Sequence, residues 1–108
     1  MLRDIDLAFI KLHILHHAAE EEVFGVGLIE ELGEHGYDLG PGTLYPTLAK
    51  MVKMGLLTVE NRVVQHKRRK YYRITPAGQE QLDGVKHKLK ELYHELIEEQ
   101  EGHHEKHE

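Results

Sequence analysis

The cations between Gly40 and Thr75 are the side chains whose type and spacing point most clearly to a chemistry. This segment holds eight Lys or Arg and a single acid, Glu60, whereas the complete 108-residue chain has a formal net charge of −5. Four of the cations are consecutive, at Lys67–Lys70. A positive segment of this density inside an acidic chain is typical of a surface that contacts a polyanion, and nucleic-acid phosphates are the first candidate.

Histidines are the second group that could do chemistry, since the chain has ten of them. His13 and His17, and also His103 and His107, are spaced i, i+4, which places each pair on one helix face in a geometry that Zn²⁺ or Ni²⁺ accepts. The sequence supplies no assured third ligand. We therefore predict no metal cofactor and interpret His13 and His17 as polar positions near a dimer interface. A metal-responsive regulator that uses these pairs stays as an alternative.

Other chemistries find little support in the composition. The chain has no Cys and no Ser, and it shows neither a glycine-rich phosphate loop nor a paired-carboxylate motif, so we do not expect an enzyme or a cofactor. No apolar run reaches the roughly 18 residues of a membrane span, and the N-terminal residues lack a signal-peptide pattern. These features predict a cytoplasmic protein without a membrane partner.

The cations would be positioned by three helices and a hairpin. Apolar periodicity and turn residues predict helices over about 4–19, 25–35 and 42–54. From Leu56 the apolar period changes to two, and a second alternating stretch covers about 70–75, with the basic residues from Gln65 to Arg69 as the connection. The predicted fold class is mainly α with a small β-hairpin (α+β), a winged helix-turn-helix followed by a long C-terminal dimerisation helix.

The third helix is predicted to read DNA in the major groove while the hairpin follows the backbone. Projection at about 100° per residue buries Leu44, Leu48, Met51 and Val52 and turns the opposite side outward. The candidate DNA contacts lie on that outward side, on its flanks and on the hairpin: Thr43, Tyr45, Thr47, Lys50, Lys67, Arg68, Arg69 and Tyr71.

The last predicted helix begins at Thr75-Pro76 with a cap residue and a proline at the first helical position. Its apolar residues recur at spacings of three and four, as in the seam of a coiled coil. These candidate dimerisation residues are Leu82, Val85, Leu89, Leu92 and Leu96. We expect a winged-helix domain over 1–75, a dimerisation helix over 76–100 and a disordered tail over 101–108.

Three ordered motifs resemble a known family. They are Gly42-Thr43-Leu44-Tyr45-Pro46-Thr47-Leu48, then Gly55-Leu56-Leu57, then Arg69-Lys70-Tyr71-Tyr72-Arg73-Ile74-Thr75-Pro76-Ala77-Gly78. Together they look like the signature of PadR-type bacterial transcriptional regulators, in the shorter subfamily with one C-terminal helix. The resemblance implies a homodimeric repressor that binds a pseudo-palindromic operator in double-stranded DNA.

Two further questions stay open at this point. A winged helix can also serve as a protein-interaction module, which remains an alternative to DNA binding. An unknown small-molecule effector is also left open. Because the chain has no Trp, stacking of a flat aromatic effector as in some members of the resembled family is not expected.

Overall fold

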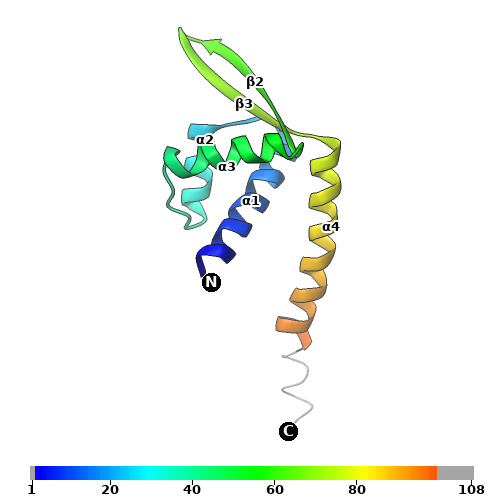
Figure 1. Ribbon diagram of the computed structural model, residues 1–108. Helices are drawn as coiled ribbons and strands as arrows, with labels where there is room; N and C mark the ends of the chain where they lie inside the picture. Colours follow the sequence, from blue (N-terminus) through cyan, green and yellow to red (C-terminus); the bar gives the residue numbers. More distant parts are fainter. Residues whose placement is uncertain (1, 100–108) are drawn as a thin grey trace.

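The computed structural model describes residues 2–99, and its helices surround the base of a small antiparallel sheet (Figure 1). The elements in chain order are α1 (Leu2–Glu20), β1 (Val23–Phe24), α2 (Gly25–Glu34), α3 (Pro41–Lys53), β2 (Leu57–Val64), β3 (Lys67–Ile74), α4 (Pro76–Tyr93) and a π-helical turn η1 (His94–Glu98). The three predicted N-terminal helices, the hairpin and the C-terminal helix are therefore all present, and the α+β fold class is confirmed.

One apolar core holds the helices and the sheet together. It is built from the inner faces of α1, α2 and α3, the base of the hairpin and the start of α4. Leu44, Leu48 and Met51, which the sequence places on the inner side of α3, are all buried in this core. Because these residues pack in the core, the rotation of α3 about its axis is set, and the opposite side of the helix faces outward.

Glycine ends both helices of the helix-turn-helix. Gly36 after α2 has φ +88° and Gly55 after α3 has φ +78°, a region that favours glycine because a Cβ is strained there. After α3, the Leu56 amide donates a hydrogen bond to the Met51 carbonyl, five residues earlier, at 3.0 Å. The equivalent bond after α2 runs from the Tyr37 amide to the Leu32 carbonyl at 2.9 Å. These caps stop α2 and α3 at defined residues and fix the connection between them.

The sheet has the strand order β1-β3-β2 with antiparallel pairing throughout. Gln65 and His66 form the two-residue turn of the β2–β3 hairpin with positive φ angles of 51° and 65°. The prediction that Lys67, Arg68 and Arg69 lie in the connection is wrong, because all three are already paired in β3. The two-residue strand β1 was not predicted, since a run this short gives no alternating signal.

Helix α4 begins as predicted at Pro76, and the Thr75 side chain accepts a hydrogen bond from the Gly78 amide at 2.9 Å. Its first turns pack in the core, and its later turns run away from the other helices (Figure 1). Within residues 2–99, no helix is long and apolar enough to cross a lipid bilayer. The predicted tail over 101–108, with His103 and His107, lies outside the described residues.

Candidate nucleic-acid interface

The exposed side of α3 carries the residues that the sequence singles out. Thr43 and Lys50 are exposed, whereas Thr47 is half-buried and its hydroxyl donates to the Thr43 carbonyl at 2.8 Å. The Thr47 hydroxyl oxygen can therefore accept a hydrogen bond more readily than the group can donate one. Lys50 also lines a mainly apolar groove of about 310 Å³ between α1, α3 and α4, so its stem lies over apolar surface and its ammonium group reaches solvent.

Tyr45 lies on the side of α3 that faces α2 and the hairpin. Its ring packs over Gly25, where a Cβ would meet the Tyr45 hydroxyl oxygen at 2.1 Å. The side chain remains 38% exposed. Tyr45 thus packs against the start of α2 and still keeps part of its side chain exposed.

The register of the hairpin divides the basic cluster between two faces of the sheet. Arg68 pairs with Val63 and Lys70 with Asn61, and alternation places both on the face of Tyr72, which is turned toward α3. Lys67 and Arg69 fall on the opposite face.

The face toward α3 contains a groove of about 190 Å³ that α3 shares with the hairpin. Tyr45 and Lys70 both line it, above the buried ring of Tyr72. Burial raises the pKa of the Tyr72 phenol, and the Tyr45 phenol raises it further, so Tyr72 stays neutral. Lys70 belongs to the predicted basic run and to the predicted second strand, but it was not among the candidate contacts named from the sequence. The alternation of that strand already places it on the face of Tyr72.

The opposite face of the hairpin is anchored by ion pairs and by arginine side chains that lie over aromatic rings. Glu22 accepts hydrogen bonds from Arg62 at 2.6 and 2.8 Å and from Arg73 at 3.2 Å. The Arg62 guanidinium lies over the Tyr71 ring, 4.4 Å from its centroid, and Arg69 lies 5.0 Å from the ring centroid of Phe24. Both Tyr71 and Arg69 therefore have intrachain partners.

The same contacts set the ionisation of this face. The hydrogen bonds from Arg62 hold the pKa of the Glu22 carboxyl below its usual value, and the charges of Arg62 and Arg73 lower it further. Glu22 and Glu60 in turn raise the pKa of Arg62. The segment between α1 and β1 is thereby tied to both long strands of the wing.

The predicted histidine pair on α1 meets a third histidine that the sequence analysis did not identify. His35, at the C-terminal cap of α2, stacks on His13 with the ring centroids 4.4 Å apart. Burial lowers the pKa of His13, and the nearby charges of His35, His17 and His16 lower it further. No periodicity connects positions 13 and 35, because the contact depends on how α1 crosses α2.

A helix-turn-helix of α2 and α3, followed by the β2–β3 hairpin as the wing, defines this chain as a winged-helix protein. Matching against family models gives the transcriptional regulator PadR-like family over residues 14–84. The curated transcriptional regulator Rv3488 of Mycobacterium tuberculosis is 48% identical over 96 residues, which cover 89% of this chain and 90% of that protein.

Solved structures show the same similarity in three dimensions. A PadR-like transcription factor from Bacteroides fragilis superposes with a TM-score of 0.78 at 25% identity, covering 87% of this chain and 92% of the other. A PadR family transcriptional regulator from Eggerthella lenta gives a TM-score of 0.75 at 29% identity, covering 85% and 81%. The chain therefore belongs to the PadR-like family of transcriptional regulators, as its three motifs indicate.

Proposed function

We propose that this chain binds double-stranded DNA as a homodimer and represses transcription from a pseudo-palindromic operator. The observation that carries the proposal is the distribution of the exposed cations. Lys50 and Lys53 are exposed on α3, and Arg68 and Lys70 lie on the face of the wing that is turned toward α3. Family membership supports DNA binding, because PadR-like regulators bind DNA. A cytoplasmic location is the corresponding expectation.

The residues divide into readers and phosphate contacts. In the proposal, Thr43, Tyr45, Thr47 and Lys50 face the major groove, where side-chain donors and acceptors distinguish base pairs. Cations on the wing neutralise phosphates and contribute affinity that falls as salt rises.

The wing cations differ in how free they are to reach phosphates. Arg68 and Lys70 lie on the face of the sheet that is turned toward α3. On the other face, the Arg69 guanidinium lies over the Phe24 ring, and the Arg62 guanidinium covers the Tyr71 ring. We therefore assign the main phosphate contacts to Arg68 and Lys70 and secondary ones to Lys67, Arg69 and Tyr71.

The dimer is proposed to form through the C-terminal half of α4 with help from α1. Of the five seam residues, Leu82 is only 4% exposed within its own chain, and Val85 is half-buried. Leu89, Leu92 and Leu96 are exposed, as are Ile5 and Phe9 on α1. These exposed apolar side chains form a continuous row on a helix that extends away from the core. Such a row is typical of an interaction surface. A second copy of the chain offers an identical row, so two copies can cover each other.

The test compares two double variants that remove the same charge from opposite faces of the wing. Operator fragments are first selected from random duplex DNA, and binding is then followed by fluorescence anisotropy from low to high salt. Arg68→Ala with Lys70→Ala should flatten the salt slope by about 3.6, the value for four lost phosphate contacts, two from each protomer of the dimer. Lys67→Ala with Arg69→Ala is the control and should flatten it less. Equal effects would refute the assignment by face.

A DNA-binding repressor also has to be separated from a winged-helix protein-interaction module. A DNA-binding protein binds random duplex DNA at low salt, because phosphate contacts do not depend on sequence. If the chain is a protein-interaction module instead, its affinity for random duplex DNA at low salt should be negligible. Measurable low-salt binding together with an enriched pair of half-sites about one helical turn apart supports the repressor. No binding at low salt would overturn the proposed function.

A further inference from the structure

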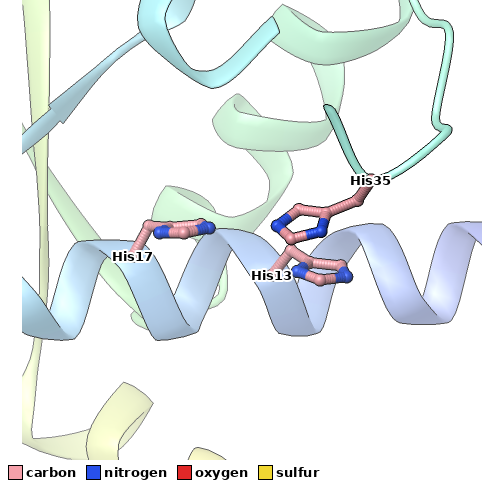
Figure 2. Close-up of side chains that lie close together, drawn as sticks. All are labelled: His13, His17 and His35. Carbon is pink, nitrogen blue, oxygen red and sulfur yellow. The ribbon is translucent and has the colours of Figure 1, made fainter. Parts of the chain in front are cut away.

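Three imidazoles from two helices converge beside the C-terminal end of α2 (Figure 2). His13 and His17 project from successive turns of α1, and His35 approaches them from the cap of α2. One nitrogen of each ring lies within 4.8 Å of a nitrogen of each of the others. Residues that are 22 and 18 positions apart in the chain thus form one cluster of ligating atoms.

The cluster also contains a buried polar atom without a hydrogen-bond partner. Among the described residues, His17 Nε2 is inaccessible to solvent and makes no hydrogen bond. The nearest acid, Glu31 Oε2 on α2, is 3.3 Å away but lies outside hydrogen-bonding angles. A buried ring nitrogen without a hydrogen-bond partner has lost its hydration and gained no contact in exchange, which costs free energy. Such an atom indicates that a further ligand or ion binds beside it.

We propose that His13, His17 and His35, with the Glu31 carboxylate as the fourth ligand, form a binding site for a transition-metal ion of the Zn²⁺ class. Imidazole nitrogen and carboxylate oxygen are both ordinary Zn²⁺ ligands. Imidazole also suits Ni²⁺ and Cu²⁺, which therefore compete. A thiolate-requiring ion is disfavoured because the chain has no Cys.

The geometry needs only a local adjustment to reach coordination. Metal–nitrogen distances near 2.0–2.1 Å and tetrahedral angles place ligand atoms about 3.3 Å apart, compared with up to 4.8 Å here. The stacked rings of His13 and His35 must separate so that their nitrogens turn toward a common point. His35 is exposed, so its side chain has the freedom to make this rotation.

A second arrangement of ligands has to be distinguished from this one. His16, His17 and Glu20 also bring ligating atoms within 4.8 Å of one another, but all three come from α1. His16 and Glu20 are exposed and already lie 3.3 Å apart as an i, i+4 pair. The arrangement with His35 is favoured because it bridges α1 and α2, and Glu31 supplies a fourth ligand from α2.

The test uses the full-length chain without an added polyhistidine tag. His103, His104 and His107 are replaced by Ala in every sample to remove metal binding by these residues. Calorimetric titration with ZnCl₂ is expected to give one ion per chain. His35→Ala should lower the affinity at least tenfold and Glu31→Gln should lower it less, while the midpoint of thermal unfolding should rise with Zn²⁺ only when His35 is present.

Two matched controls locate the site. His87→Ala removes an exposed histidine on α4 and should leave the affinity unchanged, and so should His16→Ala. Because His35 is exposed, its replacement is compatible with folding, which circular dichroism verifies. Absence of Zn²⁺ binding, unchanged affinity in His35→Ala, or loss of binding in His16→Ala would each overturn the proposal. DNA binding is not required for any of these readouts.

Discussion

Tyr45 links α3 to α2, the helix that precedes it. Its ring occupies the space that a side chain at Gly25 would need, with a contact of 2.1 Å for an added Cβ. Gly25→Ala should therefore displace the ring and weaken operator binding. Its cost in stability should be smaller than that of a clash with backbone atoms, because the partly exposed Tyr45 side chain can rotate away. Gly33→Ala is the control on the same helix, because a Cβ there meets nothing within 4 Å. Denaturant unfolding and anisotropy measure the two effects.

Tyr45→Phe separates packing from contact at this position. It keeps the ring over Gly25 and removes only the hydroxyl, so stability should change little. If the hydroxyl contacts DNA, operator affinity should fall about thirtyfold, in keeping with one hydrogen bond of about 1 kcal/mol lost from each of the two protomers. Unchanged operator affinity would restrict Tyr45 to a packing role.

Single residues also show where sequence reasoning reached its limit. The buried positions Leu44, Leu48 and Met51 were predictable, because helical periodicity reports which side of α3 meets the core. His35 was not predictable as a neighbour of His13, since the contact is set by the crossing of two helices. Lys67, Arg68 and Arg69 were misplaced for a local reason, because these three consecutive cations were interpreted as part of a loop.

At the scale of elements, α4 is held to the hairpin by a close approach at Gly78. An added Cβ there would lie 2.2 Å from the Leu56 carbonyl oxygen and 2.8 Å from a side-chain carbon of Ile74. Gly78→Ala should destabilise the protein by about 1–3 kcal/mol, because the backbone oxygen cannot rotate away as a side chain could. The matched change Gly84→Ala, in open space on the same helix, should stabilise by up to about 1 kcal/mol. Thermal and urea unfolding distinguish the two signs.

The wing is a second element whose anchoring can be tested, through pH. Its link to the segment before β1 is Glu22, whose pKa is lowered from the ordinary value of 4.5 by hydrogen bonds from Arg62. A carboxyl whose pKa is lowered in the folded state stabilises the fold fully at pH values above 4.5. This stabilisation is lost as the pH falls through the lower pKa of the folded state. Amide hydrogen exchange of β2 should therefore speed up below pH 4.5 relative to α3, after correction for intrinsic rates. Glu22→Gln should show the faster exchange at neutral pH already.

Element boundaries followed the sequence closely where a capping signal was present. Thr75-Pro76 located the start of α4, and the glycines after α2 and α3 located their ends. The hairpin was predicted from its alternation, but its second strand begins three residues earlier than expected. The pairing between β2 and β3 extends up to the turn at Gln65 and His66. The sequence did not indicate this longer pairing, because the basic residues next to the turn have no marked strand propensity.

The whole molecule presents an apolar surface that the other residues of the described range 2–99 leave exposed. Leu92, near the end of α4, is 49% exposed, and Leu96, in the following turn η1, is 58% exposed. The later turns of α4 run away from the other helices (Figure 1). Leu92→Lys with Leu96→Lys should convert a dimer into a monomer, because two like charges would be buried in each half of the interface. Light scattering across a range of protein concentrations measures the mass. Glu91→Lys, on the opposite side of α4, adds a lysine outside the seam and should leave the dimer intact.

Loss of the dimer should also remove most of the operator affinity if the two winged-helix units bind neighbouring half-sites. Two linked units gain roughly 10²–10⁴ in affinity over one, because the second unit binds at a high effective concentration. The monomeric double variant retains the cations of α3 and the wing, so its binding to random DNA at low salt should persist. Its affinity for the selected operator should fall at least a hundredfold, whereas Glu91→Lys should keep it. A monomer that still binds the operator like the parent would show that one winged helix suffices and would remove the symmetric-operator proposal.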